Sequence, residues 1–336
     1  MFSKKIFIIA EAGVNHNGKI NLALKLINEA KRVGADAVKF QIFKTNNYII
    51  KQAKLAKYQK KNYKKAKNQY DLIKKYELSE KNIFRIIDHC KKKKIQCLFS
   101  PFDIWGINTL IKNKFKIIKI PSGEIASYKF LKYLAKFNKK LILSTGMATI
   151  QEIKIAIDHL VKNGTSKKNI SILQCNTEYP TPDEDVNINV IPELKKKFKL
   201  NIGLSDHSAG ILAPILAVAK GATIIEKHLT LNKKSEGPDH KASLEPSNFM
   251  ELVKKIRQSE KILGSKNKNI SKSEKKNIKV ARKSIVAKND IQKNEKFTLS
   301  NLTEKRTGKG VGTFKIIKII GKKAKRLYKK DEIINI

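Results

Sequence analysis

The first 230 residues repeat one pattern eight times: a short apolar run is followed by a stretch with helical spacing of apolar residues. The intervening stretches place apolar side chains three and four positions apart, as at Leu26, Ile27 and Ala30. Eight strands that alternate with eight helices are the number that closes a (β/α)8 barrel. The sequence therefore predicts an α/β fold, a TIM barrel, with strands at residues 7–12, 37–43, 96–100, 115–121, 141–145, 170–175, 201–204 and 223–226.

The chain changes character after the eighth run. An amphipathic segment at 249–263 would close the barrel, and the polar stretch that follows it lacks apolar periodicity. From residue 284 onward, short apolar pieces alternate with Asn, Gly and Lys turns, which indicates a small β-rich domain. We predict a catalytic barrel over residues 1–264, a linker over 265–282 and the β-rich domain over 283–336.

Cysteine content and the length of the apolar runs indicate the cellular compartment of the protein. The chain has three cysteines, which cannot all pair, and it shows no charged leader followed by an apolar segment. The apolar runs stop at roughly five to seven residues, well short of a membrane span. We expect a cytoplasmic protein that does not enter a membrane.

The formal net charge of +43 raises the question of nucleic-acid binding. Only six of the 72 basic residues are arginine, the residue that makes bidentate contacts to bases and phosphates. Lysine is spread over the whole length of the chain. The composition favours a lysine-coated enzyme with anionic substrates and no nucleic-acid partner. A basic RNA-binding protein built on a barrel is the alternative outside the enzymes.

Polar side chains follow every predicted strand, at the end where barrel enzymes carry their chemistry. His207 and His228 end consecutive strands, so their imidazoles would lie side by side at the barrel mouth. Two such histidines can hold a divalent transition metal and leave coordination positions open for water or a carbonyl oxygen. His16 is a further candidate ligand, and His240 would either line the substrate loop or contact the metal.

Two predicted strands carry a lysine inside an apolar run. An ammonium group at Lys39 or Lys119 is costly to bury unless a partner compensates its charge. With hydroxyl groups at neighbouring strand ends, the two lysines would form a cradle for a phosphate and a carboxylate on one small molecule. The predicted cradle consists of Lys39, Lys119, Ser122, Ser144 and Ser205.

Two carboxylates follow strands on the same side of the predicted barrel. Glu11 lies on the first strand, and Glu124 follows a Pro-Ser-Gly turn after the fourth. Carboxylates in such places act as general acids or bases, or bind sugar hydroxyls. The alternative is an ion pair between either carboxylate and one of the lysines.

Two loops invite a functional interpretation. The lysine-rich stretch from 44 to 75 is either a lid over the barrel mouth or a solvated excursion. The glycine-rich segment 308–312 lacks the strand and helix that flank a phosphate loop, so we predict a flexible turn beside Arg306.

Eight motifs in a fixed order cover nearly the whole barrel. They are IAEAGVNHNG at 9–18, VKFQ at 38–41, KIPSGE at 119–124, LSTGM at 143–147, YPTP at 179–182, GLSDH at 203–207, IEKH at 225–228 and GPDH at 237–240. In these motifs the chain resembles the sialic acid synthase family of phosphoenolpyruvate-dependent enzymes. The C-terminal piece, with Arg282, Ser284 and Arg306, resembles the antifreeze-like (SAF, β-clip) domain of that family.

The resemblance implies a transferase reaction that forms a carbon–carbon bond. The methylene carbon of phosphoenolpyruvate attacks the aldehyde of an open-chain N-acylated mannosamine, water adds at the former enol carbon, and phosphate leaves. It also implies a metal, manganese, on His207 and His228, and a proton-transfer role for Glu11. Arg306 would reach the N-acyl group in the barrel of a partner subunit, which implies a domain-swapped homodimer.

Further residues receive substrate-binding roles from the same resemblance. Phosphoenolpyruvate would contact Lys39, Gln41, Lys119, Ser122, Ser144, Thr177 and Ser205. The sugar would contact Glu124, Tyr179, Asp239 and Arg306. The chain departs from the family pattern at Thr177, where some members carry asparagine, and at Thr307, where proline is usual.

Several products remain open within this family. The sixth strand exit, CNTEY at 175–179, and KASLEP at 241–246 resemble N,N'-diacetyllegionaminate synthases, and N-acetylneuraminate is the other product that we consider. The substrate would accordingly be 2,4-diacetamido-2,4,6-trideoxymannose or N-acetylmannosamine. A pseudaminate synthase, or a related synthase that condenses phosphoenolpyruvate with a phosphorylated sugar, is the alternative among enzymes.

Overall fold

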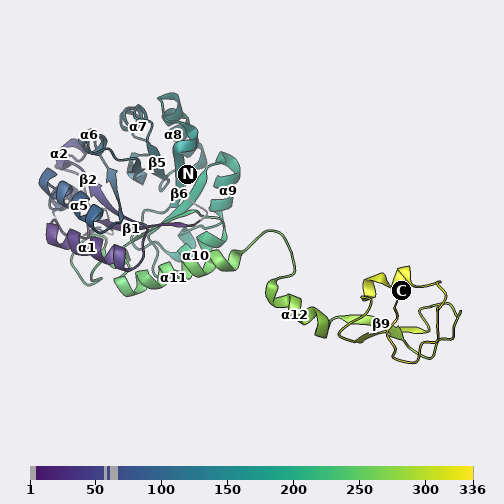
Figure 1. Ribbon diagram of the computed structural model, residues 1–336. Coiled ribbons are helices and arrows are strands. Elements are labelled where there is room, and N and C mark those ends of the chain that lie inside the picture. Colours follow the sequence, from purple (N-terminus) through teal and green to yellow (C-terminus); the bar gives the residue numbers. More distant parts are fainter. Residues whose placement is uncertain (1–4, 57–58, 61–66, 336) are drawn as a thin grey trace. The chain divides into compact units, whose positions relative to one another are not determined.

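A computed structural model of the chain describes residues 5–56, 59–60 and 67–335 (Figure 1). The chain divides into two compact units, Met1–Gly264 and Ser265–Ile336. Within the described residues, no helix is both long enough and apolar enough to cross a membrane.

The first unit is the predicted parallel barrel. Its sheet has the order β3-β2-β1-β8-β7-β6-β5-β4, and β3 also lies against β4. Every pairing in the sheet is parallel, and the strands run in sequence around the barrel. The prediction of a TIM barrel is confirmed, with strands β1 (Phe7–Gly13), β2 (Ala37–Ile42), β3 (Gln96–Pro101), β4 (Ile117–Ile120), β5 (Lys140–Ser144), β6 (Ile170–Cys175), β7 (Asn201–Asp206) and β8 (Ile224–His228).

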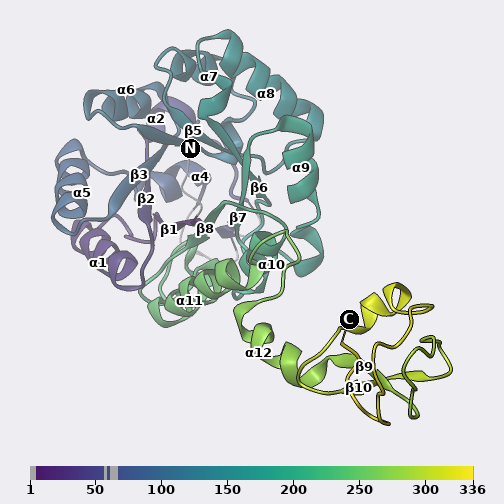
Figure 2. The ribbon, with the colours of Figure 1, turned by 45° about the vertical axis from the view of Figure 1, so that its right-hand side comes forward.

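Helices surround the strands, as Figure 2 shows in a view close to the barrel axis. Several begin at a side-chain cap that satisfies free backbone N–H groups, including Ser79, Asp103 and Thr149. Each presents one apolar face to the sheet. The helices of this unit are α1 (Ile20–Arg32), α2 (Thr45–Tyr48), α4 (Gln69–Lys74), α5 (Glu80–Lys92), α6 (Ile104–Lys112), α7 (Tyr128–Ala135), α8 (Ile150–Lys162), α9 (Val190–Phe198), α10 (Leu212–Ala219) and α11 (Pro246–Leu263), with short 3-10 turns at Ser122–Glu124, Lys167–Asn169, Asp183–Asp185 and His240–Ala242.

The barrel interior is filled in tiers. An apolar tier crosses it and consists of Ile9, Ala37, Leu98, Ile142, Leu173 and Ile224. Side chains two residues further along these strands face the same interior, because strand side chains alternate between the two faces. The next tier therefore lies nearer the carboxyl ends of the strands, and it is there that the polar residues begin.

The second unit has its own core. Helix α12 (Lys272–Ala281) precedes an antiparallel pair, β9 (Lys283–Ala287) and β10 (Leu302–Arg306), and a 3-10 helix at Thr313–Lys318 follows. Its core is formed by Ile285, Ala287, Ile291, Phe297, Leu302, Ile319, Ala324, Tyr328 and Ile334. The antiparallel sheet agrees with the β-rich domain that we predicted.

Helix α12 lies inside the segment that we predicted as a linker, so part of that segment is helical. Ser271 and Glu274 form a capping box that starts the helix. The helix buries no residue within its own unit, so its sequence carries no apolar stripe for a periodicity argument to find.

Gly203 on β7 gives a test of the barrel packing. A Cβ atom at this position would lie 2.3 Å from the Ile224 carbonyl oxygen and 2.6 Å from Leu173 Cδ2. We expect Gly203→Ala to lower the free energy of unfolding by about 2 kcal/mol or more, because the strand backbone has to move. Gly123→Ala is the matched control, since no atom lies within 4 Å of its Cβ position. Equal midpoints of urea unfolding for the two variants would contradict this packing.

Candidate active site

Each of the eight strands places one interior side chain above the apolar tier. We call this set the polar tier: Glu11, Lys39, Ser100, Lys119, Ser144, Cys175, Ser205 and Glu226. All eight side chains line a cavity of about 640 Å³. Since the strands run parallel, this cavity opens at their carboxyl ends, the catalytic end of such barrels.

Lys39 is held by three groups in the polar tier. Its Nζ lies 2.8 Å from Glu11 Oε2 and 3.7 Å from Glu226 Oε1. It also donates to Ser100 Oγ at 2.8 Å. These contacts supply the compensation that a buried ammonium group requires.

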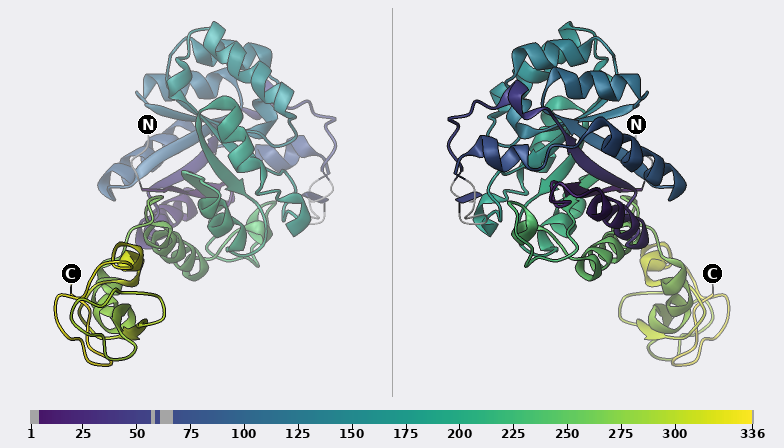
Figure 3. Two further views of the ribbon diagram at one scale, coloured as in Figure 1. Left: turned by 90° about the vertical axis from the view of Figure 1, so that its right-hand side faces the viewer. Right: turned by 90° about the vertical axis from the view of Figure 1, so that its left-hand side faces the viewer.

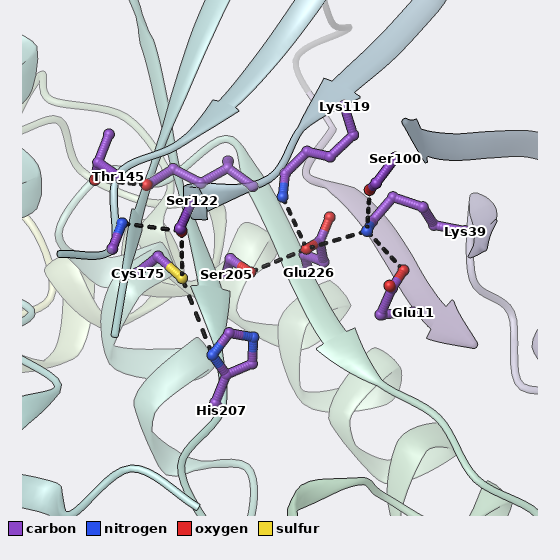
Figure 4. Close-up of polar contacts among 12 residues, drawn as sticks. Glu11, Lys39, Ser100, Lys119, Ser122, Thr145, Cys175, Ser205, His207 and Glu226 are labelled. Atoms are coloured by element: carbon purple, nitrogen blue, oxygen red, sulfur yellow. Dashed lines mark hydrogen bonds and ion pairs between the residues drawn. The ribbon is translucent and has the colours of Figure 1, made fainter. Parts of the chain in front are cut away.

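Glu226 stands at the centre of the polar tier, as Figure 4 shows. Its Oε1 accepts a hydrogen bond from Lys119 Nζ at 3.2 Å and one from Ser205 Oγ at 2.9 Å. Its Oε2 is buried and has no hydrogen-bond partner among the described residues. Two lysines and two glutamates thus share one buried site, and their charges sum to zero there when both glutamates are ionised.

The two carboxylates experience opposite electrostatic environments. Burial, reinforced by the charge of Glu226, raises the pKa of Glu11 to about 7 despite the opposing effect of Lys39. Burial also acts to raise the pKa of Glu226, but Lys119 and Lys39 outweigh it and lower that pKa to about 2. Near neutral pH, Glu226 is therefore a fixed anion, whereas Glu11 exchanges its proton.

The two predicted metal ligands lie close together at the ends of adjacent strands, at the edge of the cavity. His207 directly follows β7 and His228 ends β8, and their ring centroids are 5.3 Å apart. Tyr179 stacks on His207 with ring centroids 4.0 Å apart, and its hydroxyl lies 3.0 Å from Nε2. His228 Nδ1 has no hydrogen-bond partner among the described residues, and Asp239 Oδ2 lies 3.9 Å from it.

The two imidazoles could hold a metal and leave coordination positions open once His207 Nε2 is released from the Tyr179 hydroxyl. Within the described part of the chain, no cluster of three His, Cys, Asp or Glu side chains is arranged to hold an ion. The unpartnered nitrogen of His228 is the group that an ion would satisfy. His16 and His240 do not line the cavity, because His16 accepts from the Gly18 N–H and His240 hydrogen-bonds to Thr230.

Most of the residues predicted from sequence lie around this one cavity. Besides the polar tier and the two histidines, the lining includes Gln41, Ser122, Thr177, Tyr179 and Asp239. Glu124 does not line it: the cavity wall ends at Gly123, and Glu124 forms the last residue of the 3-10 turn. Arg306 ends β10 in the second unit and is exposed there.

Three residues of the polar tier were not predicted as site residues. Glu226, Ser100 and Cys175 all line the cavity, and Cys175 Sγ lies 4.0 Å from His207 Nδ1. The signal for Glu226 is its spacing: it precedes His228 by two positions on one strand, so both side chains face the interior. Period-two alternation from His228 would have identified it.

The described part of the lysine-rich stretch after β2 forms one wall of the cavity. Tyr48, Ile49 and Ile73 line it, together with Val14 and Phe102. Residues 57–58 and 61–66 of this stretch lie outside the described residues. Figure 3 shows the described parts of the stretch, in indigo to blue, at one end of the barrel. The wall therefore offers apolar surface beside the charged floor, together with the polar side chains of Gln59 and Gln69.

Comparisons with known proteins agree with this geometry. Residues 26–268 match the NeuB family and residues 282–335 match the SAF domain. The chain is 50% identical to N,N'-diacetyllegionaminic acid synthase of Campylobacter jejuni, over 98% of this chain and 99% of that protein. It is 40% identical to the Legionella pneumophila protein of the same name, over 95% and 90% of the two chains.

A solved structure matches as well. It is the N-acetylneuraminic acid (sialic acid) synthetase from Leptospira borgpetersenii, in complex with citrate. Its TM-score is 0.72 at 35% identity, and the match covers 82% of this chain and 90% of that one.

The raised pKa of Glu11 predicts how stability depends on pH. A carboxyl whose pKa is about 7 in the folded state and near 4.5 in the unfolded chain binds protons more tightly when folded. It therefore lowers the free energy of unfolding as pH rises from 4.5 to 7, on the order of 3 kcal/mol in total. We expect this fall in the free energy of unfolding to be absent from the Glu11→Gln variant. Urea unfolding of the wild type and the variant between pH 4.5 and 8 measures the difference, and parallel curves of unfolding free energy against pH would contradict the raised pKa of Glu11.

Proposed function

Because the chain belongs to the NeuB family, we propose that it condenses phosphoenolpyruvate with 2,4-diacetamido-2,4,6-trideoxymannose, giving N,N'-diacetyllegionaminate and phosphate. The observation that carries this proposal is the meeting of two buried lysines and two histidines in one cavity. The lysines suit an anionic donor, and the histidines suit a metal that assists an aldehyde acceptor.

Phosphoenolpyruvate would lie on the floor of the cavity. Lys39 and Lys119 supply positive charge for its phosphate and carboxylate groups. Ser144 Oγ is buried and has no hydrogen-bond partner among the described residues, so it is free to donate to an anion oxygen. The remaining contacts in this proposal come from Gln41, Ser122, Thr177 and Ser205.

The sugar would lie above phosphoenolpyruvate, beside the histidines. A divalent metal held by His207 and His228, which we take to be manganese, would supply positive charge to polarise the aldehyde oxygen. Tyr179 and Asp239 line the same part of the cavity and would bind sugar hydroxyls. Glu124, which does not line the cavity as it stands, would have to turn inward to make such a contact.

Glu11 would move the protons of this reaction. Its pKa of about 7 allows it to be either protonated or ionised at the working pH. In its protonated form it would donate to the aldehyde oxygen as the methylene carbon of phosphoenolpyruvate forms the new bond. The resulting carboxylate would then accept the proton of the water that adds at the former enol carbon.

The cavity wall supports the trideoxy sugar as substrate. Tyr48, Ile49, Ile73 and Phe102 offer apolar surface, which suits a methyl group at C6 better than a hydroxyl group. Two relatives at 50% and 40% identity are named for the legionaminic acid product. N-acetylmannosamine is the second candidate substrate, because the similar Leptospira structure is an N-acetylneuraminic acid synthetase.

Phosphate release tests this function. With manganese and phosphoenolpyruvate, we expect turnover of 2,4-diacetamido-2,4,6-trideoxymannose to exceed that of N-acetylmannosamine, and a chelator to abolish both.

His207→Ala and His228→Ala should each lower kcat/KM roughly a hundredfold or more. His159→Ala is the matched control, since that imidazole lies on helix α8 outside the cavity. Turnover only with arabinose or erythrose phosphate would sink the substrate assignment.

We propose further that the working enzyme is a homodimer in which Arg306 of each subunit completes the site of its partner. The prediction concerns mixed subunits. The Arg306→Ala and His207→Ala variants should each be inactive alone. When their subunits exchange, every hybrid dimer has one intact site, which combines His207 of the Arg306→Ala subunit with Arg306 of the His207→Ala subunit. Random exchange would restore about a quarter of wild-type activity. Size-exclusion chromatography with light scattering gives the mass, and a monomer, or no recovery after demonstrated exchange, would contradict the proposal.

A further inference from the structure

The groups that would bind phosphoenolpyruvate share one acceptor within the protein. Lys119 Nζ and Ser205 Oγ both donate to Glu226 Oε1, at 3.2 and 2.9 Å. Lys39 Nζ lies 3.7 Å from the same oxygen (Figure 4). One carboxylate oxygen therefore stands where the anionic groups of a substrate would be expected to stand.

Hydrogen-bond capacity shows that these contacts compete with a ligand. A serine hydroxyl has one proton to donate, and Ser205 donates it to Glu226. Lys39 directs two of its three ammonium protons at Glu11 and Ser100, and Glu226 attracts it as an ion pair at 3.7 Å. Donation from Ser205 to a substrate anion thus requires that its hydrogen bond to Glu226 be given up first, and the two lysines meet that anion in competition with Glu226.

The charge balance points the same way. The polar tier holds two ammonium groups and two carboxyl groups, all buried, so an arriving phosphate meets cations that already have counter-ions. A site built only for tight anion binding would leave out the carboxylate. Glu226 is instead placed between both lysines, where it weakens their attraction for any other anion.

We propose that Glu226 is an internal counter-ion for the anion cradle. Before substrate binds, it contacts Lys39, Lys119 and Ser205. These contacts are replaced by contacts with phosphoenolpyruvate when it binds, and they form again when phosphate leaves. This inference rests on the proposed function and adds a role that limits affinity and speeds product release. Glu226 is a positioning residue in this scheme, since it acts through the lysines and the serine.

Binding measurements test the exchange without turnover. We expect Glu226→Gln to lower the Kd for phosphoenolpyruvate and for inorganic phosphate by about tenfold or more, because one competing charge is removed. Isothermal titration calorimetry with each ligand alone, in the presence of a chelator, measures both constants. Glu260→Gln is the matched control: it removes one carboxylate that pairs with Arg257 and receives the Ile6 N–H, next to the first residue of β1 and outside the cavity. Its Kd values should equal those of the wild type.

Turnover should change in a matching way. Glu226→Gln should lower the KM for phosphoenolpyruvate and also lower kcat, since phosphate leaves more slowly. A burst of product formed in the first turnover would identify phosphate release as the slow step. We expect this burst to be larger in the variant than in the wild type. A residue that merely holds the lysines in place would give the opposite result, a higher KM and a higher Kd, and that outcome would overturn the inference.

A second variant covers the case in which the glutamine variant does not fold. Glu226→Asp keeps the charge but draws the carboxylate back from the lysines, so both Kd values should fall by a smaller factor. Unchanged or higher Kd values in folded Glu226→Asp would overturn the inference. Failure of the wild type itself to bind phosphoenolpyruvate would overturn the proposed function instead, so the two failures are distinguishable.

Discussion

Compensation of buried charge is the constraint on which the site depends. Lys39, Lys119, Glu11 and Glu226 are buried inside the barrel, and an unpaired charge there would cost several kcal/mol. The barrel meets this cost by bringing two cations and two anions together in one tier of its interior, with Lys39 close to Glu11 and Glu226, and Lys119 close to Glu226. The arrangement leaves little freedom for substitution, because loss of one charge leaves its partner exposed to the full penalty.

The apolar tier below makes that arrangement rigid. Ile9, Leu98 and Ile224 fill the barrel beneath the charges, and Gly203 lets two strands approach where a side chain would not fit. Glu11, Lys39 and Glu226 thus project from strands that are hydrogen-bonded on both sides, and Lys119 projects from β4, which pairs with β5. A site built on strands is held more accurately than one on loops, and this suits the proposed reaction, in which an enol and an aldehyde have to lie within bonding distance.

The sequence predicted those features that carry a local pattern. The eight apolar runs identify the barrel, and the position of His207 and His228 at strand ends identifies the mouth. Helix α12 was missed because it buries nothing within its unit, and Glu226 was passed over because the two-residue alternation of strand side chains was not followed back from His228. The convergence of Lys119, Ser205 and Lys39 on one oxygen depends on strand register, which brings together residues that are far apart in the sequence.

The charge of the whole chain and the charge of the site act on different steps. A net charge of +43 attracts a multiply charged anion from solution and raises its rate of encounter, an effect that salt screens. The polar tier contributes no net charge when both of its glutamates are ionised, so the long-range attraction does not become tight binding inside the cavity. Affinity there depends on a local exchange of partners, and protonation of Glu11 removes one opposing charge as an anion enters. A chain this basic can therefore bring an anionic substrate to the barrel and still release an anionic product.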